Sequence, residues 1–333
     1  MSLAVTLAVV VIVLAVTFDF INGFHDTANA IATVVSTRVL PPRVAIGMAA
    51  ILNIVGALTS TAVAQAISKD IVKPQAVTLE VLVGGLVGAI AWNLLTWYFG
   101  IPSSSSHALV GGVAGAAVAA GGITSLNGKG FTKIVLSFVV SPVAGVFVGL
   151  IVLFTLTLIL RNASNAGVNR WFSKLQILSA AAMAFSHGSN DAQKSMGIIA
   201  SALFAAKLIP TLHVPFWVIL TAATAMGVGT STGGWRIIKT LGHKMVKLTP
   251  VYGFAAETSA ALVIETATHL GLPVSTTHVI SSTIMSVGLQ KGPKAVNWTV
   301  IKNIGWAMLL TVPATAVVGA FAELLVHGII RLL

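Results

Sequence analysis

Two short polar motifs interrupt an otherwise apolar chain, and each occurs twice. The first places polar side chains at i, i+3, i+4 and i+7 around Asp26 and again around Asp191, 165 residues later. The second reads Pro-x-Ser-Ser/Thr-Ser/Thr-His and begins at Pro102 and at Pro273. Because both recur in the same order, the chain is predicted to consist of duplicated halves that build one site. The first motif comprises Asn22, His25, Asp26 and Asn29 in one copy and His187, Asn190, Asp191 and Lys194 in the other.

The spacing of the first motif puts its polar side chains on one face of a helix. A carboxylate inside a membrane costs about 2.5–3.5 kcal/mol, so two at matched positions indicate a function. Carboxylate and amide oxygens are hard ligands that suit Na⁺. We therefore predict sodium at Asp26 and Asp191, and Glu257 either joins the ion path or pairs with a base. The predicted coupling-ion residues are Asn22, Asp26, Asn29, Asn190, Asp191 and Glu257.

The second copy is not equivalent to the first, because Lys194 stands where the first has Asn29. A lysine is a poor neighbour for a metal cation. It suits an anion, or Asp191 itself.

The serine motif offers complementary chemistry. Proline is tolerated in the first turn of a helix, and the hydroxyls that follow lie beside free backbone N–H groups and the positive helix end. That arrangement suits a tetrahedral oxyanion. The predicted anion-binding residues are Ser103, Ser104, Ser105, Ser106, Ser275, Thr276, Thr277 and Lys194.

Each motif also contains histidine or glycine residues to which we assign a supporting role. The histidines either orient the neighbouring Asp or Ser side chains or take part in proton coupling, since histidine titrates near neutral pH. The supporting residues are Gly23, His25, His107, His187, Gly188 and His278.

Charge balance favours cotransport. A phosphate beside two ionised aspartates concentrates several negative charges in a medium that penalises unpaired charge. Lys194 offsets one unit, so the remainder requires sodium ions or protons that enter with the anion.

The composition places the chain in lipid. It is 56% hydrophobic and 8% charged, with a mean hydropathy of +0.97, whereas soluble proteins have about 25% charged residues. The net charge of +11 comes from bases scattered through connections, which indicates contact with lipid headgroups and not with nucleic acid. There is no cysteine, so a thiolate metal site is excluded.

The apolar stretches predict an all-α integral membrane protein. About twelve transmembrane or re-entrant segments are expected, at roughly 20 residues per crossing, with breaks near the polar motifs. The longer stretches fall at 3–24, 44–67, 76–99, 103–123, 132–160, 214–234, 251–270, 274–290 and 298–332, and shorter ones at 28–37, 175–190 and 195–209. We divide the chain into a first half (1–160), a connecting loop (161–173) and a second half (174–333).

The segments Phe20–Ala30 and Ser186–Lys194, together with Pro273–His278, resemble the paired signatures of the inorganic phosphate transporter (Pit) family. The resemblance implies a cation-coupled phosphate symporter of the cell membrane that works by alternating access. It implies two inverted-topology repeats with broken helices and re-entrant hairpins, and a homodimer. It also implies that Asp26 and Asp191 are essential, and that no cofactor is needed beyond the cotransported ions, with sodium favoured over protons.

Three alternatives remain at this level. A sulfate permease shares the architecture and also takes a tetrahedral oxyanion. An intramembrane metalloenzyme would need three or four convergent ligands and an open position for water, and no His-Glu-x-x-His helix is present. A channel would not concentrate its substrate against a gradient.

Overall fold

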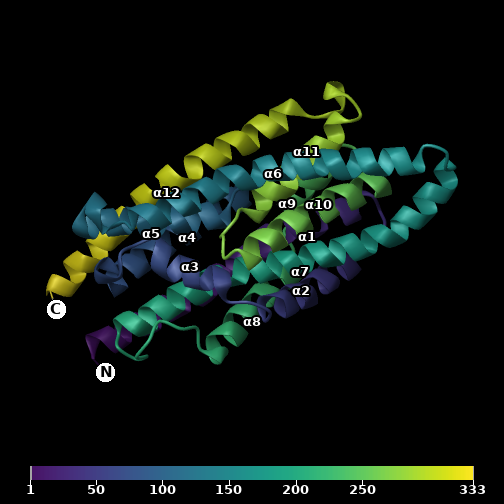
Figure 1. Ribbon diagram of the computed structural model, residues 1–333. Coiled ribbons are helices and arrows are strands. Elements are labelled where there is room, and N and C mark those ends of the chain that lie inside the picture. The colour runs from purple at the N-terminus through teal and green to yellow at the C-terminus, as the bar shows by residue number, and fades with distance from the viewer. Residues whose placement is uncertain (1, 333) are drawn as a thin grey trace.

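The computed structural model describes residues 2–332, and over that range the chain folds into helices with two isolated β-bridges and no strand (Figure 1). Short 3₁₀ turns lie at Pro74–Ala76, Ile123–Ser125 and Pro293–Ala295, and a π turn lies at Thr240–Lys244. The α-helices are α1 (Leu3–Ser36), α2 (Pro42–Ala57), α3 (Ala62–Asp70), α4 (Leu79–Phe99), α5 (Ser105–Gly121), α6 (Gly128–Leu160), α7 (Asn165–Ala205), α8 (Phe216–Thr232), α9 (Trp235–Lys239), α10 (Pro250–His269), α11 (Thr276–Leu289) and α12 (Trp298–Leu332).

Four of these helices, α1, α4, α6 and α12, are long and apolar enough to cross a membrane. A fifth crossing is formed if α2 and α3 are taken together, since they meet at a break with a bend of 69°. The all-helical, multi-pass prediction is therefore confirmed. The prediction of about twelve transmembrane or re-entrant segments is not confirmed: the described residues form twelve α-helices, but only some of them have the length and hydropathy of a span.

The predicted breaks at the aspartate motifs are wrong. Helix α1 runs without interruption through 22–29, and α7 runs through 187–194. Neither segment contains a proline, and every polar side chain of the two motifs except Asn22 has a partner within the described chain, so the backbone ladder need not open. The connection between the halves is also shorter than expected, because residues 165–173 already belong to α7.

Two interruptions at polar motifs lie in helical hairpins. In the first, α4 ends at Gly100 with φ +66°, and α5 begins after the prolyl segment at Ser105. In the second, α10 is followed by Gly271 with φ +65°, and α11 begins at Thr276. A left-handed glycine stops a helix, and the following proline prevents its continuation. Both serine motifs therefore lie at hairpin tips.

The order of elements recurs along the chain. A β-bridge joins Val72 to Leu126 before α6, and a second joins Val246 to Val296 before α12. Each is accompanied by a backbone hydrogen bond, from Asn127 N to Ile71 O and from Asn297 N to Met245 O. The same local contacts thus brace the base of each hairpin.

Two glycines of the aspartate motifs permit close helix crossings. A Cβ on Gly23 would lie 2.3 Å from the carbonyl oxygen of Met226 on α8, and a Cβ on Gly188 would lie 2.2 Å from that of Asn53 on α2. The neighbouring backbones leave no room for a side chain at either position. The two glycines thus allow α8 to pack closely against α1, and α2 to pack closely against α7.

The molecule has a polar centre and an apolar exterior. The side chains of both aspartate motifs are buried, whereas large apolar residues on α6 and α12, such as Phe147, Ile151 and Phe321, are more than half exposed. Exposed apolar residues of this extent suit a lipid environment. Figure 1 shows both termini at one end of an elongated bundle and the α6–α7 turn at the other.

Candidate functional site

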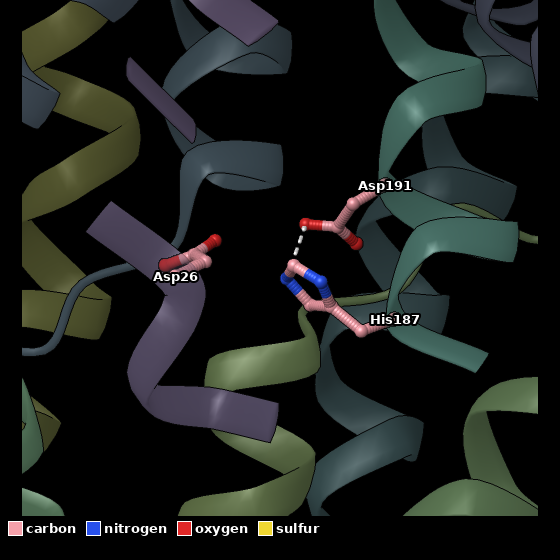
Figure 2. Close-up of side chains that lie close together, drawn as sticks. All are labelled: Asp26, His187 and Asp191. Carbon is pink, nitrogen blue, oxygen red and sulfur yellow. Dashed lines mark ion pairs between the residues drawn. The ribbon is translucent and has the colours of Figure 1, made fainter. Parts of the chain in front are cut away.

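The site lies where α1 and α7 face each other between the two hairpin tips. Asp26 projects from α1 and Asp191 from α7, and Figure 2 shows the His187 imidazole next to the Asp191 carboxylate, with Asp26 facing both from α1. One ligand atom from each of these three side chains lies within 4.8 Å of the others. The prediction that the two aspartates share a site therefore matches the geometry, and their charges stand close together.

Asp26 receives donors from both hairpins. Its Oδ2 accepts a hydrogen bond from the Ser105 hydroxyl at 3.1 Å, and its Oδ1 accepts one from the Thr277 hydroxyl at 3.4 Å. His25 Nδ1 lies 2.7 Å from the same Oδ1, while His25 Nε2 lies 3.0 Å from the Thr96 hydroxyl. His25 thereby links Asp26 to the end of α4, which is the orienting role expected for a supporting histidine.

The two amides of the first motif contribute oxygen atoms. Asn29 Nδ2 donates to the Thr277 hydroxyl at 2.9 Å and to the Thr276 hydroxyl at 3.3 Å. The buried Oδ1 atoms of Asn29 and Asn22 accept no hydrogen bond from the described part of the chain. Buried amide oxygens are costly without a partner, and both are hard ligands of the type that sodium prefers.

Asp191 has a different set of neighbours. Lys194 Nζ lies 2.6 Å from its Oδ1, the Thr276 hydroxyl donates to its Oδ2 at 3.4 Å, and His187 Nε2 lies 3.8 Å from Oδ2. His187 Nδ1 is in turn 3.0 Å from Asn53 Oδ1. The second carboxylate is thus paired with a cation that belongs to the chain.

Asn190 faces the second hairpin. Its Nδ2 donates to the Thr268 hydroxyl at 2.8 Å and to the carbonyl of Leu272 at 3.3 Å, and its Oδ1 accepts from Val274 N at 3.4 Å. Both the oxygen and the nitrogen of this amide are thus bonded to the second hairpin. Asn190 is next to Asp191 in the chain, and its contacts hold the hairpin tip in position.

The serine motifs cap their helices and join the hairpins. Ser104 and Ser275 are the N-cap residues of α5 and α11, and each accepts from the backbone N–H three residues on. This contact is the usual one for a serine cap. Ser103 donates to the Thr96 hydroxyl at 2.9 Å, and Ser106 donates to the carbonyl of Val274 at 2.7 Å. The predicted anion-binding hydroxyls therefore converge from two helix N-termini.

Two histidines of these motifs form a pair. The rings of His107 and His278 lie with centroids 4.4 Å apart, both buried, and their ring nitrogens have no hydrogen-bond partner among residues 2–332. His107 also packs on Phe138 of α6, at 4.0 Å between centroids. The pair joins the first turns of α5 and α11, and neither ring is hydrogen-bonded to an aspartate within the described chain.

Glu257 stands apart from the aspartates. Its carboxylate accepts short hydrogen bonds from the hydroxyls of Thr33 and Ser179 and a further one from Gln176 Nε2 at 3.1 Å. No lysine or arginine pairs with it within the described chain, so the predicted pairing with a base is not found, and a place on an ion path stays a prediction.

Two buried residues escaped the sequence analysis. Asp19 lies on α1 seven residues before Asp26, has no exposed surface and accepts a short hydrogen bond from the Ser195 hydroxyl. Asn53 contacts His187 and donates to the Thr230 hydroxyl at 2.9 Å. Asp19 could have been found from its spacing, since it lies two helical turns before Asp26. Asn53 carries no comparable signal, because it is a single amide in an apolar stretch.

These features define a multi-pass helical membrane protein with a buried polar site between two hairpins. The chain belongs to the phosphate transporter family, whose model matches residues 22–319. The members of this family are transporters and not enzymes, which removes the metalloenzyme alternative.

The most similar relatives include proteins described as probable low-affinity inorganic phosphate transporters. The protein of Bacillus subtilis is 49% identical, with 99% of this chain and 100% of the relative covered. That of Rhizobium meliloti is 44% identical over 96% of each chain. A solved structure described as the sodium-dependent phosphate transporter superimposes with a TM-score of 0.90 at 28% identity, covering 97% of this chain and 99% of that one.

Proposed function

We propose that this protein carries inorganic phosphate across the membrane together with a cation, with sodium favoured over protons, by alternating access. The observation that carries the proposal is the convergence of Asp26 and Asp191 on hydroxyls from both hairpin tips. One site thus contains groups for a cation and groups for an oxyanion. The descriptions of the similar transporters support phosphate as the anion.

Electrostatics supports the need for a cation. Two unit charges 4.8 Å apart repel by about 3.5 kcal/mol at an effective dielectric constant of about 20, and the carboxylates lie at or within that distance. A phosphate in the same place adds one or two negative charges. A sodium ion near Asp26, with the free amide oxygens of Asn22 and Asn29 as further ligands, would offset part of this charge.

The serine motifs supply the anion-binding groups. The hydroxyls of Ser103–Ser106 and of Ser275–Thr277 lie at the first turns of α5 and α11, where unpaired N–H groups and the positive helix end favour an anion. In this proposal phosphate takes over hydroxyl donors that now contact Asp26 and Asp191. The cation and the anion would then bind as neighbours.

The architecture supports alternating access between two related halves. Each half contributes a long helix with an aspartate motif and a hairpin with a serine motif, and the two sets meet at one site. We extend the proposal to inverted-topology repeats that rock around that site, to a homodimer, and to a location in the cell membrane. Sodium is favoured because the similar solved structure is described as sodium-dependent.

Phosphate uptake into proteoliposomes tests the proposal. The purified protein is reconstituted, and labelled phosphate is offered under an inward sodium gradient or an inward proton gradient, each with and without excess sulfate. Accumulation above the external concentration that requires sodium and resists sulfate is the expected result. Equilibration without accumulation would indicate a channel, and block by sulfate would indicate a sulfate permease; either would overturn the proposal.

A further inference from the structure

Lys194 is a cation buried against one carboxylate of the site. Its side chain has no exposed surface, and its Nζ lies 2.6 Å from Oδ1 of Asp191, three residues earlier on α7. Over residues 2–332 this is the one ion pair between a lysine or arginine and a carboxylate. Because buried charges are stable only when they are paired, Lys194 and Asp191 form a locally neutral unit.

The first copy of the motif has no such unit. Three residues after Asp26 stands Asn29, an uncharged amide. The contacts of Asp26 are hydroxyls and the His25 ring, none of which is a permanent cation. Within the chain, the charge of Asp26 is paired only if His25 or His187 is protonated, whereas that of Asp191 is paired with a lysine.

The helix holds Lys194 in this position from both sides. The residue before it, Gln193, accepts hydrogen bonds from the backbone N–H groups of Val63 at 2.8 Å and Ala64 at 3.2 Å, at the start of α3. The residue after it, Ser195, donates to Asp19 on α1. With its neighbours tied to two other helices, Lys194 is directed at Asp191.

We propose that Lys194 is a built-in cation that takes the place of a transported cation at Asp191. The transported cation then binds at Asp26, and each phosphate moves with one cation fewer than it would if position 194 were uncharged. This inference rests on the proposed cation-coupled transport of phosphate, and it identifies the residue that sets the coupling ratio.

The experiment measures that ratio directly. Labelled sodium and labelled phosphate fluxes are compared in proteoliposomes for the unaltered protein and for Lys194→Asn, which gives the second copy the residue of the first. Lys129→Asn makes the same chemical change at an exposed position on α6. If protons drive uptake, the membrane potential at which net phosphate flux is zero, measured at a fixed phosphate gradient, gives the proton-to-phosphate ratio.

We expect Lys194→Asn to raise the cation-to-phosphate ratio by one, and Lys129→Asn to keep the ratio of the unaltered protein. A ratio unchanged in Lys194→Asn, together with a raised KM for phosphate, would assign Lys194 to the phosphate and overturn the inference. Absence of any gradient-driven uptake by the unaltered protein would instead overturn the proposed function, so the two failures are distinguishable.

A binding measurement covers the case in which Lys194→Asn is folded but inactive. Removing one partner of a buried ion pair leaves the other charge unpaired, and sodium can restore the balance. The thermal unfolding midpoint of Lys194→Asn in detergent should therefore rise more with added sodium chloride than that of the unaltered protein, whereas choline chloride should have no such effect. Equal sodium responses in both proteins would contradict the inference.

Discussion

The hydroxyl of Ser106 on the first hairpin donates to the backbone carbonyl of Val274 on the second, 2.7 Å away. This bond joins the two hairpin tips, whose Ser105 and Thr277 hydroxyls contact Asp26. If the site opens alternately to the two sides of the membrane, the tips have to move relative to each other. A covalent link between them should therefore stop transport.

The absence of cysteine from the chain makes this test clean. We expect the double variant Ser106→Cys/Val274→Cys to lose phosphate uptake on mild oxidation and to regain it on reduction. The two single variants, treated in the same way, show what the substitutions cost by themselves. Unimpaired uptake by the oxidised and demonstrably cross-linked protein would show that these tips do not separate during the cycle.

Loss of the charge at Asp26 should abolish coupled uptake. Asp26→Asn keeps the size of the side chain but removes the anion that faces Asp191, and a cation loses its principal ligand. With about 3 kcal/mol at stake for a buried charge partner, phosphate uptake should fall by roughly a hundredfold or more. Glu80→Gln, which makes the corresponding acid-to-amide change in the first turn of α4, is the matched control. Uptake is measured beside the elution profile of the purified protein, and wild-type uptake by Asp26→Asn would remove Asp26 from the ion site.

Much of this arrangement follows from the sequence, because the duplicated motifs identify the site residues and recur in the same order in both halves of the chain. The pairing of Asp26 with Asp191 and the placing of the serine motifs at hairpin tips required only the duplication and the Gly-x-Pro breaks. The continuity of α1 and α7 agrees with the helical spacing of the motif's polar side chains, whereas the division into apolar stretches predicted a break at each motif. A polar run such as 22–29 interrupts hydropathy but not the helix, since Asn29 and Asp26 obtain their partners from α11, far away in the sequence.

The partner of Lys194 cannot be read from the sequence for the same reason. The sequence placed a lysine three residues after Asp191 but did not decide between the aspartate and an anion as its partner. Only the packing of α3 and α1 around Gln193 and Ser195 fixes its direction. Long-range contacts of this kind carry no local signal, which also explains why Asp19 was missed.

Adding a methyl group at Gly188 should destabilise the crossing of α7 and α2. Its Cβ would lie 2.2 Å from the carbonyl oxygen of Asn53, so the helices would have to separate. Overpacking of this type costs about 1–3 kcal/mol, and we expect Gly188→Ala to lower the thermal unfolding midpoint and the uptake rate. Gly47→Ala on α2 is the control, because a Cβ there meets no atom within 4 Å. Equal stability of the two variants would show that α7 and α2 can move apart at this crossing without a measurable loss of stability.

Substitution of Glu257 should separate cation binding from phosphate binding. The Glu257 carboxylate lies among Thr33, Ser179 and Gln176 and does not contact the hairpin hydroxyls. If it lies on the ion path, Glu257→Gln should raise several-fold the cation concentration needed for half-maximal uptake, while the KM for phosphate at saturating cation stays the same. Glu265→Gln, on the same helix, serves for comparison. A change in the phosphate KM alone would contradict a place on the ion path.

The distribution of charge predicts the orientation of the chain in the membrane. The ends of α1, α6 and α11 lie on the same side, since Thr37 donates to Gln176 Oε1 near the start of α7 and Gln290 donates to the carbonyl of Leu150 near the end of α6. The connections at this side, taken with the helical residues that adjoin them, contain bases and no acid: 37–43, 161–174, 235–249 and 290–297. Short basic connections remain in the cytoplasm, so this side should face inward and both termini outward.

Single cysteines test this orientation. Arg161→Cys, in the α6–α7 turn, should resist a membrane-impermeant thiol reagent applied to intact cells and react once the cells are opened. Lys207→Cys, after α7 at the opposite side, should react in intact cells. Both residues are at helix ends away from the site, so uptake should persist and report a folded protein. The reverse labelling pattern would mean that the basic connections face outward.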